Sequence, residues 1–212
     1  MSLNYENYIF DLDGTLIDST PSHVKAFQFA INMSTLSGKV DFDYERMKGK
    51  RTIDVMNELG FDNHEAKHLT KLKQEKYREL LNNGEVNLYS DVHNCLKLLS
   101  EKNKKVYICT GASRDSVEII LDKFKIRNFI VDYITGSDVK EAKPNPKILN
   151  NLIENNQLDK DKCIFIEDSE NGYICGQQAH VYTVLVNNSL DGLPSFKDFS
   201  HFMINLEAEL GQ

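Results

Sequence analysis

The chain has 212 residues and a formal net charge of −7, with 41% hydrophobic and 27% charged residues. This composition is ordinary for a chain that buries a hydrophobic core, and it argues against disorder. The basic residues are scattered, so we expect no nucleic-acid partner and no anionic membrane surface as a partner. No apolar run approaches the ~18 residues that span a bilayer, and no signal-peptide pattern precedes the first expected strand, which predicts a cytoplasmic protein.

Short apolar runs rich in β-forming residues recur along the chain and alternate with amphipathic segments. This alternation predicts an α/β fold with a Rossmann-like, doubly wound parallel sheet and helices on both faces. Ligands bind beyond the carboxyl ends of the strands in such sheets, so the residues directly after each strand are candidates for chemistry. The expected strands are residues 8–10, 105–109, 130–134, 163–166 and 181–186.

The stretch between the first two expected strands is too long for one crossover connection, and it reads almost entirely as helix. One helix is expected from Ser19, a candidate N-cap, and a second from about residue 52 to Gly60. A third is expected from about Asn63, another candidate N-cap, to residue 81. We therefore predict two domains, which are an α/β core of residues 1–17 and 86–212 and a small α-helical cap of residues 18–85.

Two acidic side chains, Asp11 and Asp13, directly follow the first strand in the segment Asp-Leu-Asp-Gly-Thr. In an extended chain they share a face. Carboxylates this close resist joint ionisation unless a cation or a proton lies between them, and a hard divalent cation with oxygen ligands suits the arrangement. Mg²⁺ is the expected cation. The plainer alternative is that these acids cap the helix that follows.

Three further strand ends or turns carry polar groups. The hydroxyl and backbone amides of the turn that begins at Thr110 can hold a phosphate ahead of a helix. Lys143 stands in a turn bounded by prolines, where an ammonium can neutralise phosphate and carboxylate charge. A second pair of acids, Glu167 and Asp168, ends the strand at 163–166. Taken singly, each could be an ordinary turn, a solvated lysine or a helix cap.

Together, in this order, the four segments resemble the motifs of the haloacid dehalogenase superfamily of phosphatases and phosphomutases, namely DxDGT, a strand-end hydroxyl, K-P-x-P and E-D-S-x-x-G. The resemblance implies that Asp11 is the nucleophile and Asp13 the general acid and base. It also implies that Thr110 and Lys143 take part in catalysis and hold the phosphoryl group. An acid at position 13 favours phosphate chemistry over the cleavage of carbon–halogen bonds.

The same resemblance assigns the remaining site residues. Gly111 and Ala112 would complete the phosphate-binding turn beside Thr110. Mg²⁺ would be held by Asp11, the Asp13 carbonyl and Asp168, with Glu167 binding it directly or through water.

The substrate would be recognised mainly by the inserted helices, since the family's cap closes over the site. The cap candidates are His23, Arg51 and Lys73, because basic side chains there could reach an anionic substrate. A histidine also lies in the first cap helix of the related phosphoglucomutases. The alternative is that these are solvated residues on polar helices. Further basic candidates are Lys48, Lys50, Lys76 and, after the second motif, Arg114.

The expected function is that of a Mg²⁺-dependent phosphatase that hydrolyses a small phosphorylated metabolite, such as a sugar phosphate, through an aspartyl-phosphate intermediate. The likeness is to the β-phosphoglucomutase and phosphoglycolate phosphatase branch, so a sugar phosphomutase is the first alternative. A non-catalytic regulator that binds a phosphorylated metabolite is the second. We expect a monomer or a weak homodimer.

Overall fold

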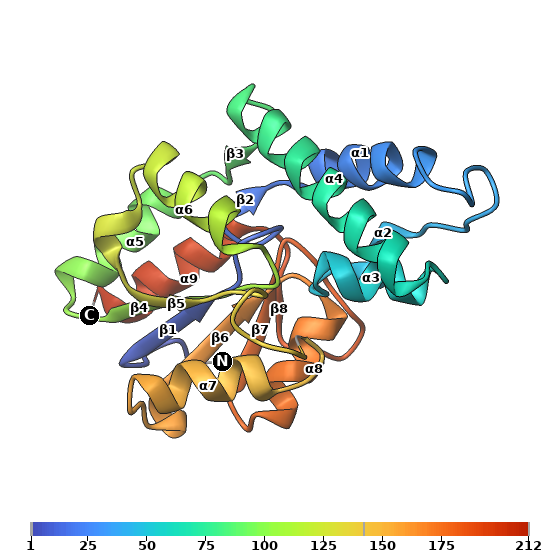
Figure 1. Ribbon diagram of the computed structural model, residues 1–212. Coiled ribbons are helices and arrows are strands. Elements are labelled where there is room, and N and C mark those ends of the chain that lie inside the picture. Colours follow the sequence, from blue (N-terminus) through green and yellow to red (C-terminus); the bar gives the residue numbers. More distant parts are fainter. Residues whose placement is uncertain (1, 142, 212) are drawn as a thin grey trace.

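A computed structural model describes residues 2–141 and 143–211 of the chain. Its centre is a six-stranded, all-parallel sheet with the strand order β5-β4-β1-β6-β7-β8 (Figure 1). The predicted α/β class is confirmed, and all five expected strands are present. The strands are β1 Asn7–Phe10, β4 Lys105–Cys109, β5 Ile130–Ile134, β6 Cys163–Glu167, β7 Tyr182–Val186 and β8 Ser195–Phe196.

Central strand β1 shows how the sheet is buried on both faces. Tyr8 and Phe10 belong to one hydrophobic cluster and Ile9 belongs to another, as the alternation of side chains along a strand requires. The first cluster is covered by α5 (Val92–Glu101), α6 (Arg114–Lys123) and α9 (Phe199–Leu210). The second is covered by α7 (Lys147–Asn155) and α8 (Glu170–Gln178), on the opposite side of the sheet (Figure 1).

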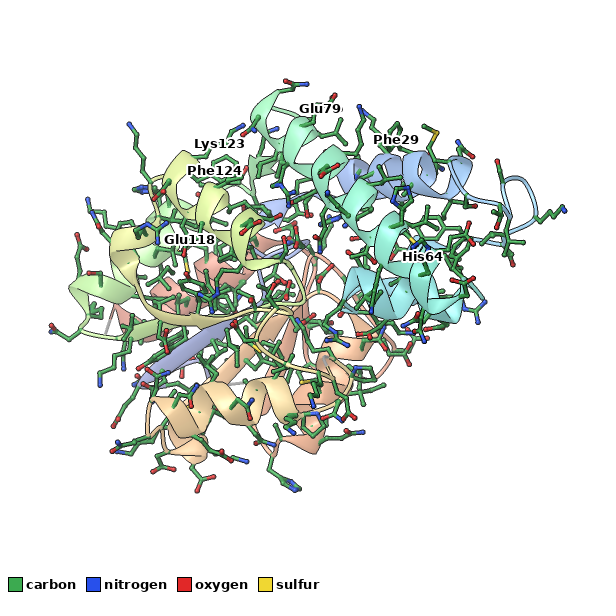
Figure 2. All side chains as sticks on the ribbon, in the orientation of Figure 1. Phe29, His64, Glu79, Glu118, Lys123 and Phe124 are labelled. Carbon is green, nitrogen blue, oxygen red and sulfur yellow. The ribbon has the colours of Figure 1, made fainter. Side chains whose placement is uncertain are left out.

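Four of the five helices between β1 and β4 form a separate unit above the carboxyl edge of the sheet (Figure 1). They surround their own apolar cluster, which includes Phe27, Met56 and Leu69. Exposed polar side chains such as His64 and Glu79 project from the outer face of this unit (Figure 2). The helices are α1 Thr20–Asn32, α2 Tyr44–Met47, α3 Thr52–Glu58 and α4 Asn63–Asn82.

The two chain crossings into this unit pair with one another. Strands β2 (Ile17–Asp18) and β3 (Asn87–Leu88) form a short antiparallel ribbon.

Short 3₁₀ helices η1 (Arg127–Phe129) and η2 (Lys160–Lys162) precede β5 and β6. No helix in the described part of the chain is long and apolar enough to cross a membrane.

Two predicted helix caps need correction. The N-cap of α4 is Asp62, whose side chain accepts from the backbone N–H groups of His64 and Glu65, so the prediction of Asn63 is one residue late. Ser19 does occupy the N-cap position of α1, but its side chain makes no capping hydrogen bond.

Substitution in the aromatic cluster formed by α9 and the sheet tests the packing of the core. Phe202 is fully buried and packs edge-on against Phe10 and Phe196. We expect Phe202→Ala to lower the free energy of unfolding by about 3–5 kcal/mol, because it removes these contacts and leaves a cavity. Urea denaturation measures the change. Ile204→Ala, on the exposed side of the same helix, is the matched control and should change stability by less than about 0.5 kcal/mol. A similar loss in both variants would contradict this packing.

Candidate active site

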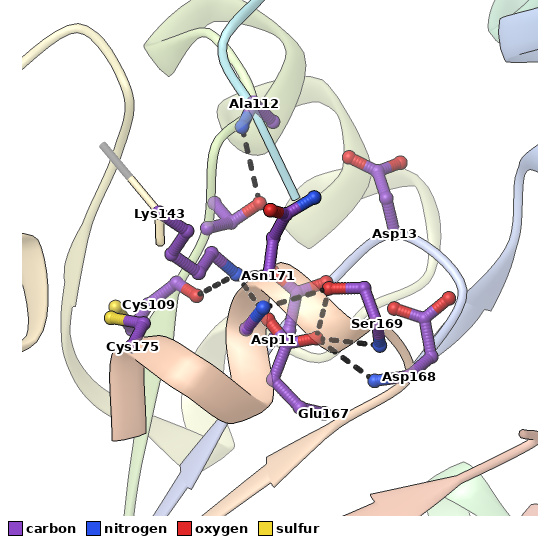
Figure 3. A network of polar contacts seen from close by, with 12 residues as sticks. Asp11, Asp13, Cys109, Ala112, Lys143, Glu167, Asp168, Ser169, Asn171 and Cys175 are labelled. Carbon is purple, nitrogen blue, oxygen red and sulfur yellow. Dashed lines mark hydrogen bonds and ion pairs between the residues drawn. The ribbon is translucent and has the colours of Figure 1, made fainter. Parts of the chain in front are cut away.

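The sheet fixes the polar side chains that follow its strands. Asp11 comes directly after β1, and its N–H donates to the Ile166 carbonyl at 2.8 Å, so its backbone continues the ladder with β6. The N–H of Thr110, directly after β4, donates to the Ile134 carbonyl at 3.1 Å. Because the strands are parallel, their carboxyl ends meet at one edge, and the predicted acids are brought together there (Figure 3).

A buried ammonium lies at the centre of this edge (Figure 3). The Lys143 Nζ donates to Asp11 Oδ1 at 2.5 Å, to a Glu167 oxygen and to the Cys109 carbonyl at 3.3 Å. Burial lowers the pKa of Lys143, but the charges of Asp11 and Glu167 outweigh it and hold that pKa well above its usual value. Burial raises the pKa of Asp11, and the Lys143 charge opposes that rise.

The Glu167 carboxylate is fully occupied by the protein. Its second oxygen accepts from the N–H of Asp168 at 2.9 Å, the N–H of Ser169 at 3.0 Å and the Ser169 hydroxyl at 2.9 Å. The first turn of α8 approaches closely because Gly172 has no side chain, since a Cβ there would lie 1.9 Å from the Glu167 carboxyl carbon. Glu167 therefore holds Lys143 and the following loop in place.

The Asp168 carboxylate rests on the loop that carries Asp13. A Cβ at Gly14 would lie 2.1 Å from Asp168 Oδ2, and Gly14 has a positive φ of 82°. Lys48 Nζ is 3.5 Å from the same oxygen. Burial and the charge of Glu167 raise the pKa of Asp168 to about 7, although Lys48 acts in the opposite direction. The positive charge of Lys48 therefore does not fully balance the negative charge around the Asp168 carboxylate.

The predicted Mg²⁺ ligands are two carboxylates, the Asp13 carbonyl and a Glu167 that binds directly or through water, so they need not appear as a cluster of acidic side chains. No group of three or more His, Cys, Asp and Glu side chains within residues 2–141 and 143–211 is placed to hold a metal ion. Glu167 is occupied by Lys143 and the loop amides, and the Asp13 side chain turns toward the helical unit. The available oxygen donors are the Asp11 and Asp168 carboxylates and the Asp13 carbonyl. Burial raises the pKa of both the Asp11 and the Asp168 carboxyl, and hard oxygen donors of this kind fit Mg²⁺.

Asp13 is linked to the helical unit by hydrogen bonds. Its Oδ1 lies 2.8 Å from His23 Nε2 on α1 and accepts from the Tyr77 hydroxyl on α4 at 3.0 Å. Burial raises the pKa of Asp13, but His23 and Lys73 lower it well below its usual range. This lowered pKa favours the ionised form of Asp13.

The tautomer of His23 follows from its two neighbours. Lys73 Nζ lies 2.7 Å from His23 Nδ1, and an ammonium can only donate, so Nδ1 accepts. Burial and the Lys73 charge lower the pKa of His23, which keeps the ring neutral. Its proton is then on Nε2 and is donated to Asp13. The ring stacks on Tyr77 at a centroid distance of 4.1 Å and an angle of 6°, which fixes its plane.

Most of the predicted binding residues line one pocket above these acids. Thr110, Gly111 and Ala112 form its core side, and the Thr110 hydroxyl accepts from the Ala112 N–H at 3.2 Å. His23 and Lys73 form part of its helical side. The remaining lining includes Phe27, Tyr44, Met47, Lys48, Gly49, Lys50 and Thr52.

Arg51 lies elsewhere. Its guanidinium donates to both oxygens of Asp54, at 2.7 and 2.6 Å, and to the Val139 carbonyl at 2.6 Å. Asp54 lies one turn along α3 and satisfies the guanidinium, so Arg51 joins the helical unit to the core and does not line the pocket. Backbone packing supports this junction, since a Cβ on Gly111 would lie 2.7 Å from the Gly49 carbonyl oxygen.

Sequence reasoning missed the aromatic residues around Asp13. Tyr77 follows Lys73 by four residues on α4, so the two share a helix face. That spacing could have identified Tyr77 as a neighbour of Lys73. Tyr44 belongs to a four-residue helix that gives no periodic signal, and only the tertiary structure places it beside His23.

Comparison with known proteins identifies the family of the chain. Residues 8–186 match the model of the haloacid dehalogenase-like hydrolase family. The chain therefore belongs to this family of enzymes, and the resemblance inferred from its motifs is confirmed.

Individual relatives are distant in sequence but similar in fold. Pyrophosphatase PpaX of Oceanobacillus iheyensis is 24% identical over 197 residues, which cover 93% of this chain and 90% of that protein. The structure of CbbY from Rhodobacter sphaeroides in complex with phosphate has a TM-score of 0.81 at 18% identity, covering 96% of this chain and 100% of that one. β-Phosphoglucomutase from Clostridium difficile has a TM-score of 0.80 at 19% identity, covering 99% and 100%.

We expect the buried ammonium of Lys73 to lower the free energy of unfolding of the wild type. Burial lowers its pKa to about 8, below the value of an unfolded lysine, so the folded state binds fewer protons between pH 8 and about pH 10.4. Wild-type stability therefore rises with pH across that window. Below pH 8 the buried lysine is charged, and its full destabilising effect applies. We expect Lys73→Met to raise the free energy of unfolding by about 2–3 kcal/mol at pH 7, with a smaller gain at pH 9.5.

Urea denaturation of both proteins at the two pH values measures this gain. Lys76→Met, a less buried lysine on the same helix, is the control and should show a change under about 0.5 kcal/mol at both. A Lys73→Met protein that is less stable than wild type at pH 7 would show that the buried ammonium is net stabilising.

Proposed function

We propose that the chain is a Mg²⁺-dependent phosphatase that hydrolyses a small phosphorylated metabolite through an aspartyl phosphate on Asp11. One observation carries the proposal. Asp11 and Asp13 lie two residues apart below a pocket, with Asp11 bonded to the buried Lys143 and Asp13 bonded to His23 from the helical unit. The likeness to pyrophosphatases and to a β-phosphoglucomutase supports phosphate chemistry.

In the first step an Asp11 carboxylate oxygen attacks phosphorus, and the bond from phosphorus to the leaving oxygen breaks. Lys143 favours the ionised form of Asp11 and offsets negative charge at the reacting group. The Thr110 hydroxyl and the N–H groups of its turn are available to hold the equatorial phosphate oxygens. Mg²⁺, when bound, supplies further positive charge for these oxygens; Asp11, Asp168 and the Asp13 carbonyl would hold it.

Asp13 moves the proton in both steps. A phosphate beside it adds negative charge and raises its pKa, which favours uptake of a proton before the leaving oxygen needs one. Asp13 gives that proton to the leaving group, and its carboxylate then takes a proton from the water that attacks phosphorus. His23 holds the carboxylate in place, and Lys73 fixes the tautomer in which His23 donates.

Residues 18–85 serve in this proposal as the cap domain, and residues 1–17 and 86–212 as the core. The contacts that close the cap over the acids include those of His23 and Tyr77 with Asp13 and of Lys48 with Asp168. Asn171 Nδ2 also donates to the Lys48 carbonyl at 2.8 Å.

A sugar phosphomutase is the second candidate, because the acids are well shielded. Asp11 and Asp168 are each only 4% exposed with the cap in this position. Exclusion of bulk water would prolong the life of the aspartyl phosphate until a second sugar phosphate accepts the group. Hydrolysis and transfer then differ only in the acceptor.

Phosphate release separates these functions. With Mg²⁺ and a panel of sugar, polyol and carboxylate phosphates and pyrophosphate, we expect the wild type to release inorganic phosphate from at least one compound. Asp11→Asn removes the nucleophile and should lower that rate by at least about 10³-fold.

Asp115→Asn, at an exposed acid at the start of α6, is the control for the change of charge and should keep wild-type activity. Glucose 1-phosphate with its 1,6-bisphosphate as primer is tested in parallel. Glucose 6-phosphate that accumulates without free phosphate would identify a mutase. A folded, Mg²⁺-loaded wild type that is inactive on every compound would favour the binding-protein alternative.

A further inference from the structure

Two consecutive asparagines after β7 connect the loop that carries Asp13 with the loop that carries Asp168. Neither asparagine belongs to the four sequence motifs. Strand β7 pairs with β6, and Leu185 lies opposite Glu167 in that register. The chain leaves β7 at Asn187 and Asn188, so both lie at the carboxyl edge of the sheet beside the Asp168 loop.

Asn187 holds the loop that carries Asp13. Its Nδ2 donates to the Gly14 carbonyl at 2.8 Å and to the Thr15 carbonyl at 3.2 Å. Its Oδ1 accepts from the Phe199 N–H at the start of α9, at 2.9 Å. The residue has a positive φ of 59°, which asparagine tolerates better than most residues. The side chain thus uses both ends of its amide to connect the Asp13 loop with α9.

Asn188 holds the other loop. Its Nδ2 donates to the backbone carbonyl of Asp168 at 2.7 Å. The two loops also touch directly, because the Asp168 carboxylate packs on Gly14 without room for a Cβ. A shift of either loop would therefore change the position of Asp168 relative to the Asp13 backbone.

We propose that Asn187 and Asn188 are positioning residues for the reaction. They hold the loops that carry Asp13 and Asp168 at a fixed position relative to one another. This role rests on the proposed phosphoryl transfer. Neither side chain touches the reacting groups, so their loss should lower kcat and leave substrate binding largely intact. A displacement on the order of 1 Å at such a distance from the chemistry can cost about 10²-fold in rate.

The test compares Asn187→Gly and Asn187→Asp with wild type. Glycine keeps the left-handed backbone and removes all three hydrogen bonds, whereas aspartate turns a carboxylate toward two carbonyl oxygens. We expect kcat to fall by about 10- to 100-fold in both, with KM changed less than about threefold. Asn188→Ala should lower kcat in the same way.

Asn103 supplies the matched control. It has the same residue type and a φ of 56°, is exposed, and lies before β4 at the opposite edge of the sheet. Asn103→Gly and Asn103→Asp should keep wild-type kcat and KM. An unchanged kcat in the Asn187 variants, or equal losses in the Asn103 variants, would overturn the positioning role.

Hydrogen exchange followed by mass spectrometry tests the same inference without activity. In Asn187→Gly we expect faster exchange in a peptide covering residues 11–18, and unchanged exchange in β4 and α7. Unchanged exchange in that peptide would overturn the inference even if the variant folds normally. Absence of activity in the wild type would contradict the proposed function alone, because the exchange result does not depend on it.

Discussion

The buried Lys143 ammonium between Asp11 and Glu167 is the interaction on which the site depends. It brings together residues from three parts of the chain, and its side chain has no exposed surface. Without that positive charge, two carboxylates would be buried and unpaired, an arrangement that costs several kcal/mol. Glu167 in turn fixes the loop to Asp168 and Ser169 through its second oxygen. The same ion pairs therefore position Asp11 and the loop that carries Asp168.

Asp13 connects this core to the inserted helices. Its carboxylate is bonded to His23 and Tyr77, whereas Asp11 is bonded to Lys143. The two neighbouring acids consequently have opposite pKa shifts, because burial raises the pKa of Asp11 and residues of the helical unit lower the pKa of Asp13. The proposed roles need the reverse, an ionised Asp11 and a protonated Asp13, so a bound cation would have to lower the pKa of Asp11 and a bound phosphate would have to raise that of Asp13. In our account, cap position and the protonation of Asp13 are physically coupled.

The five longer strands and the acids that follow two of them could be predicted because buried parallel strands are short apolar runs, and their ends must share an edge. The α/β class and the family follow from those runs and the four motifs. Local pattern was not sufficient for β2 and β3, since a two-residue strand has no periodicity. The same holds for α2, which has only four residues.

The hydrogen-bond and ion-pair partners of the site side chains could not be predicted, because they depend on contacts between distant segments. Glu167 belongs to an acidic motif, yet its oxygens are occupied by Lys143 and loop amides. Arg51 belongs to a basic stretch of the insert, yet Asp54 and a core carbonyl occupy its guanidinium. The role of Asn187 depends on the left-handed turn that follows β7, and single residues of that kind leave no sequence pattern.

Direct detection of phosphate on Asp11 tests the central claim. Asp13→Asn, which cannot activate water, would be mixed with Mg²⁺ and an activated aryl phosphate whose leaving group needs no general acid, then quenched in acid and digested. We predict a phosphorylated peptide containing Asp11, present in this variant and absent from the Asp11→Asn/Asp13→Asn double variant. A phosphoryl group on another residue, or release of the aryl alcohol without any phosphorylated peptide, would contradict the account.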